Sequence, residues 1–138
     1  MHAVNGIDGV LTANSFEGKT VYLDCDIILN DTSKANWQLS ANEWFTGSWA
    51  KAFRGHLDGN YHIISGLYLN KTKDNYDGTN YYGGLFACIG QNAVIEKLGI
   101  VNSNLTFTDD LSTKYLGVFA GFVDQYNAAS GSLPLIDF

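Results

Sequence analysis

The most regular pattern along the chain is a short alternation of apolar and polar residues. Between Val21 and Leu29, an apolar side chain stands at every second position, and Asp24 and Asp26 stand between them. Alternation with a period of two places successive side chains on opposite faces of a β-strand, so the two acids are expected to point outward. The sequence has no ten-residue run with the spacing of an amphipathic helix. The pattern predicts an all-β fold.

Similar strings recur along the chain at intervals of roughly 31 to 40 residues, a spacing typical of repeat architectures. Residues 84–87 (GLFA) resemble residues 117–120 (GVFA), 33 positions later. Three apolar strings that end on Asn, at 23–30, 64–70 and 95–102, are separated by about 40 and by 31 or 32 positions. A unit of this length that is built from short strands fits a β-solenoid whose coils stack about 4.8 Å apart. A β-sandwich of seven short strands is the alternative.

One string resembles a known repeat family. Residues 53–70 (FRGHLDGNYHIISGLYLN) resemble the F-x-G-x-x-D-G-x-x-H-x-I-x-G-L string of GLUG-type repeat proteins. Residues 83–86 with 93–99 resemble the same repeat, and residues 15–23 with 26–27 resemble the segment before the first repeat. The resemblance implies a right-handed parallel β-helix of about three to four coils in a large secreted or wall-attached bacterial protein.

The chain departs from this family at the naming motif. Ala87 and Ala120 stand where Gly usually follows Gly-Leu-x. Alanine fits such a corner only with a negative φ angle, because positive φ crowds its Cβ atom. We therefore expect negative φ at both alanines.

The repeats divide the chain into a short leading segment and a long repeat region. Residues 1–14 are interpreted as the remnant of an N-terminal capping helix or linker, and residues 15–138 as β-helix repeats with insertions near 31–52 and 71–82. Because the terminal coil of a solenoid needs a polar cap, both ends are expected to be truncated, which makes the chain a fragment of a longer protein. The alternative is a short natural chain whose open coil ends pair into a homo-oligomer.

Composition narrows the classes of function. The chain has 138 residues, of which 46% are hydrophobic and 16% are charged, as in a globular domain. Its net charge of −6 argues against nucleic acid as a partner, because phosphate binding needs clustered positive charge. Its apolar runs are too short for a transmembrane helix, so no membrane span is expected.

One pair of acids is a candidate for catalysis. Asp24 and Asp26, two positions apart on one expected strand, would lie about 6 to 7 Å apart on the same face. Paired carboxylates at such separations serve glycosidases. A polysaccharide lyase would also need a basic residue, and Arg54, the only arginine, or Lys97 would supply it. The alternative is the solvated face of a strand.

Both cysteines are expected in the core as free thiols. Cys25 alternates with Leu23 and Ile27, and Cys88 lies in the apolar string 85–89. About two coils would separate the two cysteines by about 9 to 10 Å along the solenoid. Disulfide-bonded Cα atoms lie within about 7 Å, so no disulfide is expected.

The best binding signal is a group of aromatic residues in the two expected insertions. Flat exposed rings stack on sugar faces and dominate binding patches. Because the segments near 35–50 and 73–82 are otherwise polar, their rings are candidates for contact with a glycan or a surface protein. These residues are Trp37, Trp44, Trp49, Tyr76, Tyr81 and Tyr82. The alternative is that the insertions fold over the flank of the solenoid and bury their rings.

Metal-binding patterns are incomplete. Asp74 and Asp77 resemble half of an EF-hand calcium loop, but Lys73 stands where a further acid is needed. His56 and His62 flank one turn without the spacing of a zinc site, and they are expected to form a polar corner. We expect no metal or other cofactor, with calcium as the alternative.

Asparagine recurs after the apolar strings. Asn30, Asn70 and Asn104 are expected at equivalent corners, where stacked side-chain amides hydrogen-bond along a solenoid.

These features favour a non-catalytic repeat module that acts in adhesion, spacing, or glycan or protein binding. The resemblance implies an extracellular or cell-surface location in a bacterial protein, as part of a longer chain. Two alternatives stay open. One is a fragment of a carbohydrate-active β-helix enzyme, a lyase or a glycosidase. The other is a self-assembling element that pairs through open coil ends.

Overall fold

The computed structural model describes residues 14–44, 52–72, 80–108, 113–124 and 135–137. Within these ranges, the regular structure is β-strand except for one 3-10 helix, η1, which spans Trp37–Ser40. The expected all-β class is confirmed.

The strands are short, and all of their pairings are parallel. In chain order they are β1 (Thr20–Tyr22), β2 (Ile27–Ile28), β3 (His56–Asp58), β4 (Ile63–Ser65), β5 (Tyr68–Lys71), β6 (Asn80–Gly83), β7 (Phe86–Ile89), β8 (Val94–Glu96), β9 (Gly99–Val101), β10 (Asn104–Phe107), β11 (Thr113–Leu116), β12 (Ala120–Val123) and β13 (Leu135–Ile136). Isoleucine, valine, threonine and aromatic residues are frequent in them, as expected for side chains that pack on a pleated surface.

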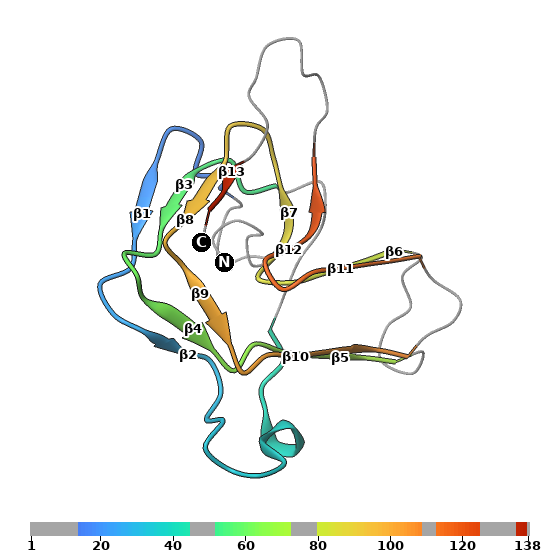
Figure 1. Cartoon of the computed structure of the whole chain (residues 1–138). Helices are drawn as coiled ribbons and strands as arrows, with labels where there is room; N and C mark the ends of the chain where they lie inside the picture. Colours follow the sequence, from blue (N-terminus) through green and yellow to red (C-terminus); the bar gives the residue numbers. More distant parts are fainter. Residues whose placement is uncertain (1–13, 45–51, 73–79, 109–112, 125–134, 138) are drawn as a thin grey trace.

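Each strand pairs with a strand from another pass of the chain. We call a pass the stretch that visits these strand positions once: β1 and β2 belong to the first pass, β3 to β7 to the second, β8 to β12 to the third, and β13 to the fourth. The sheets have the orders β1-β3-β8-β13, β2-β4-β9, β5-β10, β6-β11 and β7-β12. Figure 1 shows these sheets arranged around a common interior, with β5-β10 and β6-β11 extending as two arms. Strands that lie about 33 to 41 positions apart along the chain are therefore paired in five small parallel sheets.

The number of residues between paired positions varies among the sheets. Val21 pairs with Leu57, and Leu57 pairs in turn with Ile95. Ile64 pairs with Ile100. These separations are 36 to 38 positions, whereas Tyr82 pairs with Tyr115 33 positions later and Ile95 pairs with Ile136 41 positions later.

The expected match between the strings 64–70 and 95–102 is wrong. Ile64 pairs with Ile100, whereas Ile95 belongs to a different sheet and pairs with β3. Each pass contains several strand-to-corner units that need the same apolar and turn residues. A unit can therefore resemble its neighbour in sequence as closely as it resembles the strand with which it pairs.

The expected match between the strings 84–87 and 117–120 agrees with one strand pairing and differs from the next by one position. Gly83 pairs with Leu116, which keeps the offset expected from the strings 84–87 and 117–120, but Phe86 pairs with Ala120 rather than with Phe119. The third pass therefore carries one more residue between these two strands than the second. Neither Ala87 nor Ala120 has a positive φ angle, as expected.

The expected stack of Asn30, Asn70 and Asn104 is wrong. Asn70 pairs with Thr106, and Asn104 pairs with Tyr68. The 34 positions between Asn70 and Asn104 differ from the 36-position offset of β5 and β10, so the two asparagines are not opposite each other.

The apolar core lies between the sheets. Leu57 on β3 is 3% exposed and Ile95 on β8 is fully buried. The core cluster draws on β3, β4, β7, β8 and the corners beside them, and it consists of Phe53, Leu57, Ile64, Leu85, Phe86, Ile89, Ala93, Ile95 and Leu98. Strands from several sheets thus share one interior.

The single expected strand from 21 to 29 is interrupted. β1 ends at Tyr22 and β2 begins at Ile27, with a bend at Asp24 and Cys25 between them. Cys25 is exposed, so its expected burial is wrong. The bend resets the alternation of the side chains, because a corner does not preserve the two-residue period of a strand.

Cys88 is buried in β7, as expected, and both cysteines are free thiols. Burial is the main cause that raises the pKa of the Cys88 thiol, to about 11. A thiol in this state is a packing residue rather than a nucleophile.

Candidate functional site

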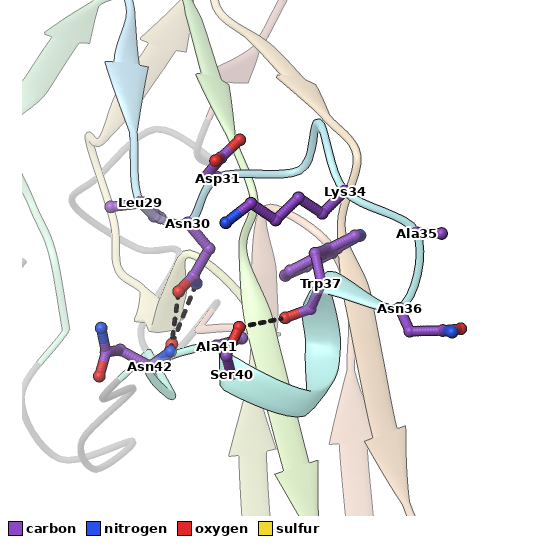
Figure 2. Close-up of a pocket in the computed structure, with 10 residues that line it drawn as sticks. All are labelled: Leu29, Asn30, Asp31, Lys34, Ala35, Asn36, Trp37, Ser40, Ala41 and Asn42. Atoms are coloured by element: carbon purple, nitrogen blue, oxygen red, sulfur yellow. Dashed lines mark hydrogen bonds between the residues drawn. The ribbon is translucent and has the colours of Figure 1, made fainter.

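One cavity in the described part of the chain lies in the loop that follows β2. It has a volume of about 280 Å³ and opens to solvent. Figure 2 shows the residues that line it: Leu29, Asn30, Asp31, Lys34, Ala35, Asn36, Trp37, Ser40, Ala41 and Asn42. This Trp37 pocket contains one of the aromatic residues that the sequence marks as a binding candidate.

Asn30 closes the loop at its base. Its Nδ2 donates to the backbone oxygens of Asn42 (3.0 Å) and Gly66 (2.8 Å), and its Oδ1 accepts from the Asn42 N–H (2.7 Å). Gly66 has a φ of 75°, and a Cβ atom there would lie 2.5 Å from the Asn30 backbone oxygen. Only glycine allows this approach. A buried side chain thus joins both ends of the loop to the second pass.

The helix η1 presents the aromatic ring. Asn36 precedes it with a left-handed conformation (φ 58°), which asparagine tolerates better than most residues. The Ser40 hydroxyl donates to the Trp37 carbonyl oxygen (3.4 Å). The Trp37 ring packs edge-on against Tyr68 of β5, with ring centroids 5.8 Å apart. The ring is therefore supported by the strand body and stays partly exposed.

Two opposite charges stand at the mouth of the pocket. Hydrogen bonds from Ser33, first from its side chain and then from its backbone N–H, hold the pKa of Asp31 below its ordinary value, and the charge of Lys34 acts in the same direction. In Figure 2 the Lys34 side chain extends from the far side of the loop toward Asp31, above the Trp37 ring. The pocket therefore offers an ionised acceptor and a cationic donor beside an aromatic ring.

This combination suits a small polyhydroxylated ligand. A cavity of about 280 Å³ is just below the range of about 300 to 1,000 Å³ that holds drug-sized ligands, so it fits a molecule the size of one sugar ring. Sugar hydroxyls both donate and accept, and the apolar face of a sugar packs on an indole ring. Asp31, Lys34 and Ser40 supply the polar contacts for such a ligand.

The other candidate aromatic residues lie apart from this pocket. Trp44 packs against the core, and its Nε1 donates to the Leu85 oxygen (3.0 Å). Tyr81 is only 6% exposed and packs on Phe107, so its expected role as an exposed binding ring is wrong. The strand β6 turns Tyr81 inward. Trp49 and Tyr76 lie outside the described residues.

Tyr82 belongs to an aromatic ladder on the opposite face of β6. Its ring is stacked on Tyr115 of β11, with centroids 4.9 Å apart, and Phe122 of β12 meets both rings edge-on. Burial is the main cause that raises the pKa of Tyr82 above its ordinary value. This ladder stabilises the pairing of the second and third passes.

The structure does not bring the candidate catalytic residues into one site. Asp26 accepts hydrogen bonds from the Ile63 N–H (3.0 Å) and from His62 Nδ1 (3.1 Å), and these bonds lower its pKa, the backbone bond most. Arg54 forms an ion pair with Asp124 instead (3.8 Å). Asp24 is exposed at the bend beside β1. The three residues therefore have separate surroundings.

The candidate calcium ligands Asp74 and Asp77 lie outside the described residues. The two histidines do not meet across their turn. His62 bonds to Asp26, whereas His56 Nε2 lies in hydrogen-bond contact with Glu96 Oε1 (2.8 Å).

Sequence reasoning missed most of the pocket. Asp31, Lys34 and Ser40 lie in the insertion near 31–52, where only the tryptophans are predicted to bind, because charged and hydroxyl side chains are ordinary in a surface loop. The burial of Asn30 and the positive φ angle of Gly66, which fix the shape of the loop, are seen only in the structure.

Two curated proteins are similar to parts of the chain. A Gly-rich membrane protein of Evansella cellulosilytica is 35% identical over 60 residues, which make up 44% of this chain and 6% of that protein. Halomucin of Haloquadratum walsbyi is 26% identical over 124 residues, which make up 89% of this chain and 1% of halomucin. The chain thus spans a small fraction of the length of these relatives. No protein-family model matches the chain, and no solved structure matches it significantly.

None of the described ranges contains a helix with the length and hydropathy that a bilayer crossing requires.

Proposed function

We propose that the chain is a non-catalytic, glycan-binding repeat module of a secreted or cell-surface protein, and that it holds a sugar in the Trp37 pocket. The observation that carries the proposal is the pocket itself, in which Trp37 stands beside Asp31 and Lys34 on a loop of fixed shape. An aromatic ring with a few convergent polar groups is the common design of a small-molecule site.

The strand pairing supports a parallel β-helix as the scaffold. All pairings are parallel and join positions one pass apart along the chain, as in the pairs Tyr82 with Tyr115 and Ile95 with Ile136. Connections between parallel strands of one sheet are right-handed in about 98% of cases, which favours a right-handed helix. The resemblance of residues 53–70 to GLUG-type repeats agrees with this scaffold.

The relatives support a surface location and a modular role. One of them is named as a membrane protein, and the matched segments make up 6% and 1% of the two relatives. A short repeat region inside a very long protein fits adhesion or spacing better than a self-contained enzyme.

The surroundings of the catalytic candidate Asp26, and those of Asp31 and Asp58, do not suit the acid of a glycosidase. A glycosidase needs one carboxylic acid that stays protonated, which requires a raised pKa. Asp26, Asp31 and Asp58 all have a pKa below the ordinary value. The main causes are hydrogen bonds from the Ile63 backbone, from Ser33 and from the Asn60 backbone, respectively, which stabilise the ionised forms.

The test is a glycan array screened with the protein displayed on multivalent beads, followed by calorimetry with the free sugar. Multivalent display raises the avidity of a weak site. We expect the Trp37→Ala variant to bind about 10- to 30-fold more weakly, as for an aromatic residue at the centre of a binding site.

Leu39→Ala is the matched control, because Leu39 lies on the same helix η1, is 88% exposed and does not line the pocket. It should bind as the unaltered protein does. Equal binding by Trp37→Ala and Leu39→Ala, or no bound glycan at all, would contradict the proposal.

A further inference from the structure

A second cluster of polar side chains lies on the outer face of two paired strands, away from the Trp37 pocket. His56 and Asp58 point outward from β3, and Glu96 pairs with Asp58 from the neighbouring strand β8. Leu57 and Ile95 pair with each other next to these polar residues, and their side chains are buried in the core. Because β3 and β8 lie inside the four-stranded sheet, the backbone positions of the three polar residues are fixed.

The three side chains converge. One imidazole nitrogen of His56 and one carboxylate oxygen each of Asp58 and Glu96 lie within 4.8 Å of one another. Ligand atoms around a zinc ion lie about 2.0 to 2.2 Å from it, and hence roughly 3.4 Å apart. Small side-chain rotations therefore bring the three atoms to coordination distance.

One of the two carboxylate oxygens of Asp58 already accepts a hydrogen bond from the backbone. Asp58 Oδ1 accepts from the Asn60 N–H (2.8 Å), which orients the carboxylate. Oxygen Oδ2 is thereby left facing the cluster. An outer hydrogen bond of this kind positions metal ligands in known sites.

A cationic side chain lies beside the two carboxylates. Lys97 Nζ is 3.2 Å from Asp58 Oδ2 and 3.5 Å from Glu96 Oε1. The Lys97 side chain is 38% exposed and has a flexible stem, so it can turn into solvent. Its partners Asp58 and Glu96 are less exposed, at 13% and 25%, so a metal ion has to outcompete a partly buried ion pair. The cluster thus attracts a cation and has a competitor that can leave.

The geometry points to a site for a divalent transition-metal ion of the zinc class on His56, Asp58 and Glu96, which opens when Lys97 turns away. Imidazole nitrogen together with carboxylate oxygens suits such an ion, whereas calcium and magnesium take oxygen ligands only. A bound ion would join the second and third passes directly through β3 and β8.

The experiment uses Co²⁺ as the probe, because its visible absorption reports the coordinating atoms. The protein carries Cys25→Ser, which removes the exposed thiol as a rival ligand. We expect one Co²⁺ per chain with a visible absorption band, and displacement of that band by Zn²⁺.

Four variants in this background decide the assignment. Lys97→Met should tighten binding about tenfold, because it removes a positive charge from the site. His56→Ala and Glu96→Gln should each weaken binding at least about 100-fold, since each removes a ligand. His62→Ala is the matched control and should bind normally, because His62 contacts Asp26 instead.

Circular dichroism checks that each variant is folded. If His56→Ala does not fold, the test rests on Glu96→Gln, which keeps the shape of the side chain. The proposal is overturned if the Lys97→Met protein binds no Co²⁺ at a Co²⁺ concentration of about 1 mM, because a dissociation constant above this value corresponds to a very weak site. It is equally overturned if Co²⁺ binding survives in Glu96→Gln.

Discussion

The strands that line the core and the loop that carries the Trp37 pocket are held in different ways. β3 and β8 each pair with a strand on both sides, and their central residues Leu57 and Ile95 are buried. The loop from 30 to 42 contains no strand, and its described contacts to the body come from single side chains, chiefly Asn30 and Trp37.

This difference separates stability from recognition. In the body, many equivalent pairings contribute to one core, so a change there affects the whole fold. In the loop, one amide group fixes the shape, so a change there affects the pocket first. The two regions can therefore be perturbed independently, and three substitutions test this separation.

The largest effect is expected in the body. Ile95→Ala should lower the free energy of unfolding by about 3 to 4 kcal/mol, because it leaves a cavity at a fully buried position. Urea denaturation measures the loss. Ile28→Ala, at a position 72% exposed on β2, is the control and should change stability by less than about 0.5 kcal/mol. Equal effects at the two positions would break the comparison.

A smaller and local effect is expected at the base of the loop. Asn30→Ala should cost about 2 kcal/mol, because it leaves backbone groups of Asn42 and Gly66 without their partner. Hydrogen exchange should show loss of protection at the Asn42 N–H while the amide of Ile95 stays protected.

Leu39→Ala is the control for the loop, because Leu39 lies in the same loop and its side chain is 88% exposed. It should leave the exchange of Asn42 nearly unchanged. If Asn30→Ala exposed the amides of β3 and β8 as well, the loop and the body would form one cooperative unit.

The smallest effect is expected at the corner between the first two strands. Asp26 has a pKa below its ordinary value of about 3.9, mainly because of the hydrogen bond from the Ile63 N–H. A lowered carboxyl pKa contributes stability above the ordinary pKa, and this contribution is lost as the pH falls through the lowered value. The urea midpoint should therefore drop from pH 5 to pH 3, and by less in Asp26→Asn. Asp24→Asn, at the exposed neighbouring position, should keep the full drop.

The fold class could be predicted because the alternation of apolar and polar residues can be recognised within one strand. Leu57 between His56 and Asp58 gives the inward and outward faces of β3 without knowledge of any other strand. The length of a pass could not be predicted in the same way. The strings at 64–70 and 95–102 satisfy the same corner geometry at different positions, so their likeness aligned Ile64 with Ile95, whereas Ile64 pairs with Ile100.

The sites depend on that missing register. Trp37 could be marked because an aromatic ring in a polar segment is unusual, but its polar neighbours could not be placed around it without the bonds of Asn30. His56 and Glu96 are 40 residues apart, and their 2.8 Å contact follows only once β3 is aligned with β8. A wrong register therefore hides every site that is formed between passes.

The contrast between the two thiols allows selective labelling. The Cys88 side chain is buried in β7 and the pKa of its thiol is about 11, so a maleimide at neutral pH does not react with it. Cys25 stands exposed at the bend between β1 and β2. A fluorophore or spin label added to the unaltered protein will therefore attach at one known corner of the molecule, and it can report distances from there to a bound glycan or metal ion.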